Sequence, residues 1–187
     1  MKLEEQLRRL DALGMSLNEG VTIEDLLRAD SRERYEERPF DTILFVFGAE
    51  LKRASSWQPV CANVWNFDTE CIYSTGDYAK IVRRLCEVSG DADFLHDVKD
   101  LFNRESRTAW LEYRTPDGVE RFWTLRVNDD WADTAIIAKV MIHIERDGKR
   151  FYFKDNGQAM VLFFLDEDTA GEINGLADGA LKPCPRR

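Results

Sequence analysis

The sequence predicts an α+β fold, with a four-stranded antiparallel sheet built from two C-terminal hairpins and packed with N-terminal and intervening helices. Two turn motifs carry this prediction. Thr115-Pro116-Asp117-Gly118 separates two strand-like segments, and Asp155-Asn156-Gly157 separates two more. Helical patterns occupy much of the chain before the first hairpin and the stretch between the hairpins. Hairpin strands with helices around them are typical of α+β domains.

The N-terminal part of the sequence is expected to be helical. Leucines recur at helical spacing within residues 2–13, with charged residues between them. Residues 22–29 read as a short helix that begins with a capping threonine, and residues 31–38 as a charged helix that begins with a capping serine. The apolar residues 40–51 fit either a buried helix or a buried strand. We favour the helix because residues 48–53 continue like a helical turn.

The middle of the sequence begins with an extended segment over residues 60–72, which is rich in β-branched and aromatic side chains. Turn residues 74–77 then open a helix over residues 78–88, which Gly90 closes. The second half alternates hairpins and helices: strands over 108–114, 119–127, 150–154 and 159–165, and helices over 132–145 and 168–176. Four aromatic residues should lie in these strands, at least two of them buried against helices: Trp110, Trp123, Phe151 and Phe163.

Length and composition favour a single α+β domain over residues 1–182, followed by a loose tail over residues 183–187. A chain of 187 residues with 44% hydrophobic content can bury a core without metal or disulfide support. The four cysteines form no C-x-x-C pair, which argues against a zinc site and a redox pair. The N-terminus has no signal-peptide core and no run has the length of a membrane span, so we expect a cytoplasmic protein.

The net charge of −9 is unevenly distributed. Residues 128–178 contain eleven acidic and five basic side chains, a local balance of −6. Negative charge repels phosphate backbones, so nucleic-acid binding is not expected. The same charge attracts a basic protein and speeds the encounter with it. The alternative is that the charge serves only to keep the chain in solution.

The run from Asn128 to Asp133 concentrates three carboxylates around Trp131, where a strand pattern gives way to a helix pattern. Three interpretations fit it. The aspartates can cap the helix start, they can recognise a partner, or they can join Asp155 or Asp68 around a divalent cation. The metal site is the least favoured interpretation, because the spacing matches no calcium loop and histidines are absent from the run.

A second acidic pattern lies in residues 65–72. If this segment is a strand, Asn66, Asp68, Glu70 and Ile72 share one face, opposite a packed face that carries Trp65 and Phe67. Paired carboxylates can also act as acid and base, although nothing in the sequence indicates a pocket. His143 fits a packing or surface position on its helix better than a catalytic one, and no serine or glycine-rich motif indicates catalysis.

The segments WNFDTECI with the following GDY, and VNDDWAD, resemble those of uncharacterised bacterial α+β proteins. In size, acidity and lack of a catalytic motif the chain is similar to immunity proteins of bacterial toxin systems, such as those that guard against type VI secretion effectors. This resemblance implies a cytosolic inhibitor that binds a cognate toxin, often a nuclease with a basic groove. It transfers no role to any individual residue.

The function expected from the sequence is therefore stoichiometric binding of a basic protein toxin, without catalysis, cofactor or bound metal. The alternatives are a small metal-dependent hydrolase that uses the acidic cluster and a regulatory or structural module without a toxin partner. The sequence leaves the oligomeric state open. The residues expected to contact the partner are Asp68, Glu70, Asp129, Asp130, Trp131 and Asp133.

Overall fold

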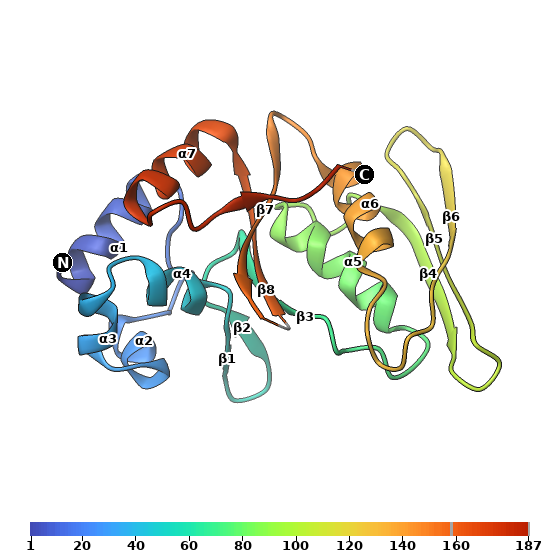
Figure 1. The fold of residues 1–187 in the computed structure, drawn as a ribbon, viewed down its shortest axis with the longest axis horizontal. Coiled ribbons are helices and arrows are strands. Elements are labelled where there is room, and N and C mark those ends of the chain that lie inside the picture. Colours follow the sequence, from blue (N-terminus) through green and yellow to red (C-terminus); the bar gives the residue numbers. More distant parts are fainter. Residues whose placement is uncertain (158, 187) are drawn as a thin grey trace. The chain divides into compact units, whose positions relative to one another are not determined.

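The computed structural model describes residues 1–157 and 159–186, and their contacts cluster in two compact units. The first unit comprises Met1–Phe67 and Tyr152–Pro183, and the second comprises Asp68–Phe151 together with residues 184–186. The chain thus leaves the first unit after Phe67 and returns to it at Tyr152, where the sequence had suggested one domain over residues 1–182. Helices accompany antiparallel strands in both units, which confirms the α+β class (Figure 1).

The first unit contains the helices expected near the N-terminus. Thr22 caps the second helix through a complete capping box with Asp25, and Ser31 accepts a bond from the Arg34 N–H at the start of the third. The segment over residues 40–51 divides into a short helix and a short strand, because the helix ends at Gly48. The helices of this unit are α1 (Leu3–Ala12), α2 (Ile23–Ala29), α3 (Arg32–Glu37), α4 (Asp41–Phe47) and α7 (Glu167–Leu176).

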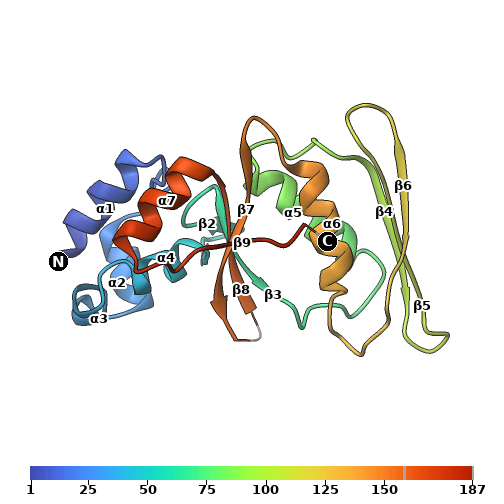
Figure 2. The ribbon, with the colours of Figure 1, turned by 45° about the horizontal axis from the view of Figure 1, so that its top comes forward.

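Two sheets accompany these helices. A short antiparallel pair joins β1 (Glu50–Lys52) to β2 (Trp57–Pro59). A four-stranded antiparallel sheet contains the second predicted hairpin, extended by one strand on each side (Figure 2). Its strands, in spatial order, are β3 (Val64–Asp68), β8 (Ala159–Asp166), β7 (Lys149–Asn156) and β9 (Lys182–Pro183).

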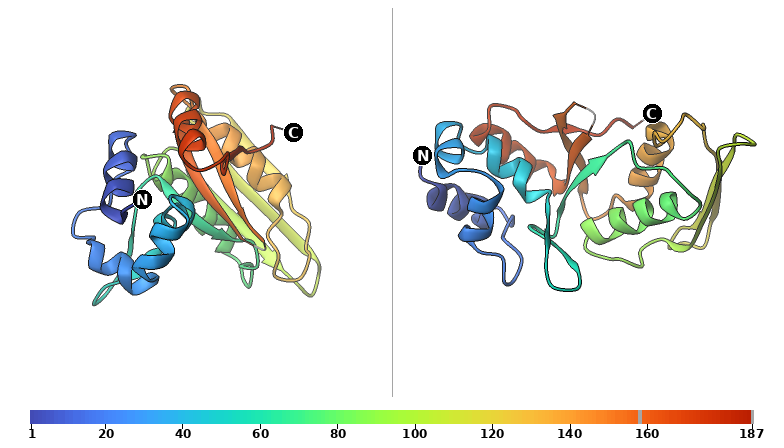
Figure 3. Two further views of the ribbon diagram at one scale, coloured as in Figure 1. Left: turned by 60° about the vertical axis from the view of Figure 1, so that its left-hand side comes forward. Right: turned by 90° about the horizontal axis from the view of Figure 1, so that it is seen from below.

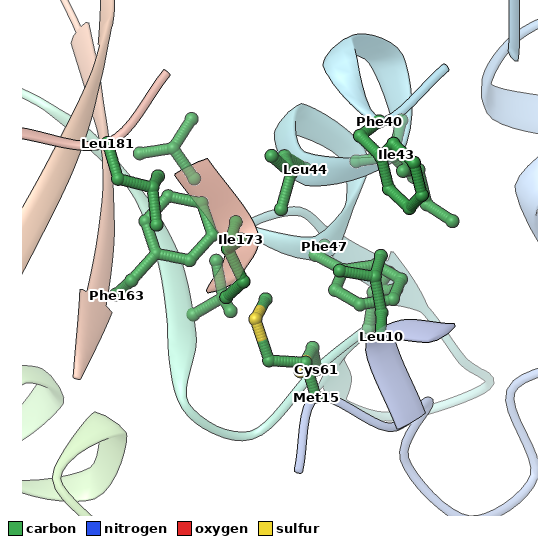
Figure 4. Packing of buried hydrophobic residues seen from close by; sticks show 14 of the residues in the cluster. Leu10, Met15, Phe40, Ile43, Leu44, Phe47, Cys61, Phe163, Ile173 and Leu181 are labelled. Carbon is green, nitrogen blue, oxygen red and sulfur yellow. The ribbon is translucent and has the colours of Figure 1, made fainter. Parts of the chain in front are cut away.

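The core of the first unit gathers side chains from α1, α4, α7 and β8, as Figure 4 shows for Leu10, Phe47 and Phe163. Gly48 is required at the point of closest approach. A Cβ atom there would lie 2.8 Å from the backbone nitrogen of Asn66 and 2.8 Å from Cγ1 of Val161. The helix α4 can therefore end against β3 and β8 only without a side chain at this position.

The second unit packs two helices on a three-stranded antiparallel sheet. Both helices lie on the same side of this sheet (Figure 3, right). The first predicted hairpin forms here, and Gly118 in its turn has φ +83°. The elements are α5 (Asp77–Val88), α6 (Thr134–Ile144) and the strands β4 (His96–Asn103), β5 (Thr108–Arg114) and β6 (Glu120–Thr124).

The two predicted hairpins are thus confirmed, but each lies in a sheet of its own. Of the four aromatic residues expected in the hairpin strands, Phe151 and Phe163 are fully buried, while Trp110 and Trp123 are half-buried. This confirms the expectation that at least two would be buried. Within the described ranges, no helix is long and apolar enough to cross a membrane.

The C-terminal segment, expected to be loose from residue 183, makes specific contacts up to Arg186. Pro183 pairs with Tyr152 in the four-stranded sheet. Cys184 is buried, its N–H donates to the Phe151 carbonyl at 3.0 Å, and its own carbonyl accepts a bond from Arg150 at 2.7 Å. Arg186 forms an ion pair with Glu145 at 2.6 Å, and Arg187 lies outside the described residues.

Candidate functional site

The structure brings the two acidic segments of the sequence side by side in the second unit. Glu70 and Trp131 form an antiparallel β-bridge. On either side of it, the Ala132 N–H donates to the Thr69 carbonyl at 2.8 Å and the Ile72 N–H donates to the Asp130 carbonyl at 2.9 Å. Two backbone hydrogen bonds that flank the bridge therefore fix residues 69–72 against residues 130–132. The predicted site residues on both segments lie next to one another as a result.

The carboxylate of Asp133 caps helix α6 rather than contributing to the surface on which the other carboxylates lie. Its carboxylate accepts a bond from the Ile136 N–H at 3.4 Å, as expected for the N-cap of α6, and another from the Arg126 N–H at 2.9 Å. Its own N–H donates to the buried Tyr78 hydroxyl at 2.9 Å. The capping interpretation of the run therefore holds for this aspartate, whose carboxylate fixes the direction in which α6 leaves the bridge.

Asp129 and Asp130 occupy the turn that precedes the bridge. Asp129 adopts φ +54°, a left-handed conformation that aspartate tolerates better than most residues. Its exposed carboxylate forms an ion pair with Arg104. The Trp131 N–H donates to the Asn128 carbonyl at 3.0 Å and closes the turn, which leaves the indole half-buried.

Asp68 and Asp130 lie close enough to two neighbouring side chains to perturb their ionisation. Burial, together with the charges of Asp68, Asp77 and Asp130, raises the pKa of Cys71 to about 11, so its thiol stays protonated at neutral pH. Desolvation and the charges of Asp130 and Asp68 also raise the pKa of Tyr73. These carboxylates from both segments therefore face the same patch of surface.

Tyr73 lies near Asp68, Glu70 and Asp130, and the sequence pattern had not singled it out. Its side chain is 70% exposed, and its hydroxyl donates to the Glu70 carbonyl at 3.1 Å. The carboxylate of Asp77 accepts the N–H groups of Tyr73 and Ser74 at 2.9 and 2.8 Å, which fixes the backbone under the ring. We define the acidic surface as Asp68, Glu70, Asp129 and Asp130 together with the ring of Tyr73.

The same carboxylates do not form a metal centre. Within residues 1–157 and 159–186, no group of three or more histidine, cysteine, aspartate or glutamate side chains has the geometry to hold a metal ion. One oxygen of Asp68 accepts the Glu70 N–H at 2.9 Å. Asp155, the other aspartate considered for such a site, accepts the Gly157 N–H at 3.0 Å in the turn between β7 and β8. In this part of the chain these aspartates therefore do not converge on one point with two further such side chains.

His143 belongs to a polar network on the inner face of the three-stranded sheet. The Trp123 Nε1–H donates to the Tyr113 hydroxyl at 3.2 Å, and this hydroxyl lies 2.7 Å from Nδ1 of His143. The roles of the hydroxyl and Nδ1 depend on the histidine tautomer: with the imidazole proton on Nε2, the hydroxyl donates to Nδ1. Burial and the nearby charge of Arg121 lower the pKa of His143. The network joins α6 to β5 and β6, which is the packing position expected for this histidine.

His96 lines a separate concave region of about 470 Å³, between the end of α5 and the start of β4. Its charged lining mixes both signs, with Arg83 and Lys99 facing Glu87 and Asp93. None of the predicted site residues contributes to it. The region therefore adds no charge or aromatic anchor to the acidic surface.

Comparisons with known proteins found no match among family models, curated proteins or solved structures. The proposal for the function of this chain accordingly rests on the acidic surface. Its four carboxylates, Asp68, Glu70, Asp129 and Asp130, were visible as acidic patterns in the sequence, as was the neighbouring Trp131. Their position beside Tyr73 became visible only with the β-bridge.

Proposed function

We propose that this chain is a protein-binding inhibitor, most specifically an immunity protein that neutralises a basic bacterial toxin by stoichiometric binding through the acidic surface. The observation that carries this proposal is the exposed ring of Tyr73 among carboxylates from two segments joined by the Glu70–Trp131 bridge. Exposed aromatic anchors surrounded by charged groups are typical of tight protein interfaces. The size, the acidity and the lack of a catalytic motif, in which the chain is similar to immunity proteins, point in the same direction.

The acidic surface is held in one conformation before any partner arrives. The backbone hydrogen bonds at the Glu70–Trp131 bridge hold the two acidic segments together. The carboxylate of Asp77 fixes the turn that presents Tyr73. A surface that is already ordered loses less conformational entropy on binding than a mobile loop does. We therefore expect little of the binding free energy that the anchor contributes to be lost to ordering this segment.

The charge of the surface selects a basic partner. Four carboxylates contribute to it: Asp68, Glu70, Asp129, which pairs with Arg104, and Asp130. These carboxylates are part of the overall charge of −9, and a basic protein is attracted to them over a distance of about one Debye length, roughly 8–10 Å. Such attraction raises mainly the association rate and makes it dependent on salt.

Two alternatives use the same residues differently. A metal-dependent hydrolase would need Asp68, Asp129, Asp130 and Asp133 around one cation, whereas Asp133 caps α6 and Asp129 pairs with Arg104. A regulatory module without a toxin partner would keep the acidic surface and differ only in what binds there. The identity of the partner therefore distinguishes the second alternative from the proposal.

The test uses the purified product of the gene adjacent to the one that encodes this chain. Titration calorimetry should show a complex of one chain with one molecule of that product, and co-expression should relieve its toxicity in a bacterial host. The triple variant Asp68→Asn, Asp129→Asn, Asp130→Asn should weaken both effects, because asparagine keeps the local hydrogen bonds and removes the charge. It leaves the Asp133 cap intact.

A matched control removes three exposed carboxylates from the first unit instead: Glu24→Gln, Glu33→Gln and Glu37→Gln. This control reduces the net negative charge by the same amount as the Asn variant does. If both triple variants bind equally well, the acidic surface is not the recognition surface. If the native chain forms no complex and relieves no toxicity, the immunity function itself is wrong.

A further inference from the structure

The two edges of the three-stranded sheet differ, and the difference identifies a second interaction surface. The β4 edge is covered within the chain. Thr75 Oγ1 accepts the Phe102 N–H at 3.0 Å and donates to the Phe102 carbonyl at 3.2 Å, while the Asp100 carboxylate accepts the Gly76 N–H at 2.9 Å. A register irregularity between His96 and Lys99 also interrupts this edge. Such features prevent a sheet edge from pairing with another strand.

The β6 edge has no such cover. The Leu125 N–H donates to the Ala109 carbonyl at 2.9 Å, and the Thr115 N–H donates to the Val119 carbonyl at 3.0 Å. These two hydrogen bonds show which residues of β6 direct their backbone groups toward β5. Because alternate residues of an antiparallel strand face opposite sides, Glu120, Phe122 and Thr124 turn their backbone groups away from β5. Over residues 1–157 and 159–186, we find no hydrogen bond to these outward backbone groups.

Of the three residues whose backbone groups point outward, the central one, Phe122, is aromatic and lies between Glu120 and Thr124. Phe122 is 60% exposed, and because it pairs with Glu112 rather than with a buried residue of β5 it lies on the open face of the sheet. Its ring stacks on that of Trp110 with centroids 5.7 Å apart. An exposed aromatic pair beside an unpaired strand edge is the surface that strand addition uses, since backbone bonds give affinity and alternate side chains give specificity.

We propose that β6 pairs antiparallel with β6 of a second copy of this chain, about a two-fold axis at Phe122, so that two three-stranded sheets become one sheet of six strands. The register follows from the outward groups. Centring the pair on Phe122 engages all three outward residues of each strand, because Glu120 then faces Thr124 of the second copy. Centring it one residue earlier would place two Arg121 guanidinium groups opposite each other, which is unfavourable.

The side chains of β6 are complementary to themselves in this register. Phe122 meets its own symmetry mate, which extends the Trp110–Phe122 stack across the axis. Arg121 faces Trp123 of the second copy, so no two like charges of β6 lie directly opposite each other. Within one copy the Trp123 ring is already in contact with Lys139, whose Nζ lies 4.7 Å from the ring centroid. The β6 strand is therefore self-complementary in antiparallel pairing, and for this reason we assign its open edge to a second copy. The inference does not depend on the toxin partner.

Sedimentation velocity of the full chain over a wide concentration range tests this proposal. We expect a reversible monomer–dimer equilibrium, in which Phe122→Lys weakens the dimer by about tenfold or more because two ammonium groups then meet at the axis. The matched control, His96→Lys, adds the same charge at the start of β4 and should leave the dimer unchanged. A chain that is monomeric at every concentration would overturn the proposal.

A covalent trap tests the register independently. In a Cys71→Ser background, Phe122→Cys would bring two sulfur atoms together at the axis, where Cα atoms of a hydrogen-bonded pair lie about 5.5 Å apart and within disulfide range. Mild oxidation with a disulfide such as oxidised glutathione should give a cross-linked dimer, in which two thiols lose their protons and two electrons to the oxidant. The His96→Cys control should not cross-link. A dimer that survives Phe122→Lys and is not trapped at position 122 would refute pairing through β6.

Discussion

The central strands of the two larger sheets show opposite patterns of burial. In β8 of the first unit, five consecutive residues from Val161 to Leu165 are buried, so both faces of the strand are covered. In β5 of the second unit, Ala109, Leu111 and Tyr113 are buried while the residues between them are more exposed. A continuous apolar run thus marks a strand enclosed by packing, and an alternating run marks a sheet with one open face.

This difference has a functional consequence. The enclosed sheet of the first unit has little surface on β8 to offer a partner, whereas the one-sided sheet of the second unit exposes Phe122 and the edge of β6. The acidic surface also belongs to the second unit. We therefore expect substitutions in the enclosed sheet to change mainly stability, and exposed substitutions in the second unit to change mainly association.

The largest effect should come from Phe163→Ala in β8. This side chain is fully buried, and its truncation leaves a cavity that typically costs about 3–5 kcal/mol in the free energy of unfolding. Phe122→Ala, on the open face of the other sheet, should cost about 0.5 kcal/mol or less. Urea denaturation of both variants measures the contrast. Similar losses in the two variants would contradict the distinction between an enclosed and an open sheet.

Gly48→Ala should have the next largest effect. The added Cβ atom would meet the Asn66 nitrogen and the Val161 methyl group, both at 2.8 Å, and overpacking of this kind costs about 1–3 kcal/mol. Gly171→Ala is the matched control, because it sits inside α7 and a Cβ atom added there would have no other atom within 4 Å. There alanine should stabilise the helix by about 0.5–1 kcal/mol. Thermal melts that move in the same direction for both variants would show that close approach at Gly48 is unimportant.

A smaller, pH-dependent effect is expected at His143 in the second unit. Its folded-state pKa lies below 6.5 because of burial and the charge of Arg121, with Asp117 acting in the opposite direction. The unfolded chain therefore binds a proton that the folded chain resists, and the free energy of unfolding falls as the pH drops below about 6.5. His143→Gln should flatten this part of the profile. The same pH dependence in the Gln variant would assign it to another group.

Much of the fold could be predicted from local sequence patterns. Capping residues such as Thr22 and turn motifs such as Thr115–Gly118 act within a few residues, so their structures follow from neighbouring chemistry. The strand β4 could not be predicted, since His96–Asn103 mixes charged and apolar side chains without regular alternation. Pairing with β5 makes it a strand.

The candidate site was predictable in its residues but not in its assembly. The carboxylates of Asp68 and Asp130 were visible as local acidic patterns. The bridge between Glu70 and Trp131 joins positions far apart in the chain, and no local pattern specifies such a contact. Tyr73 lies between the extended segment and the turn and belongs to no acidic pattern, so only its exposure in the structure identifies it as an anchor.

The association rate with the purified neighbouring-gene product, measured by stopped flow against ionic strength, tests the central claim most directly. The native chain and the Glu24→Gln, Glu33→Gln, Glu37→Gln control should associate quickly at low salt and slow steeply as salt increases. The Asp68→Asn, Asp129→Asn, Asp130→Asn variant should start slower and respond less to salt. If instead this variant matches the native rate and salt dependence, the acidic surface does not steer recognition and the account is contradicted.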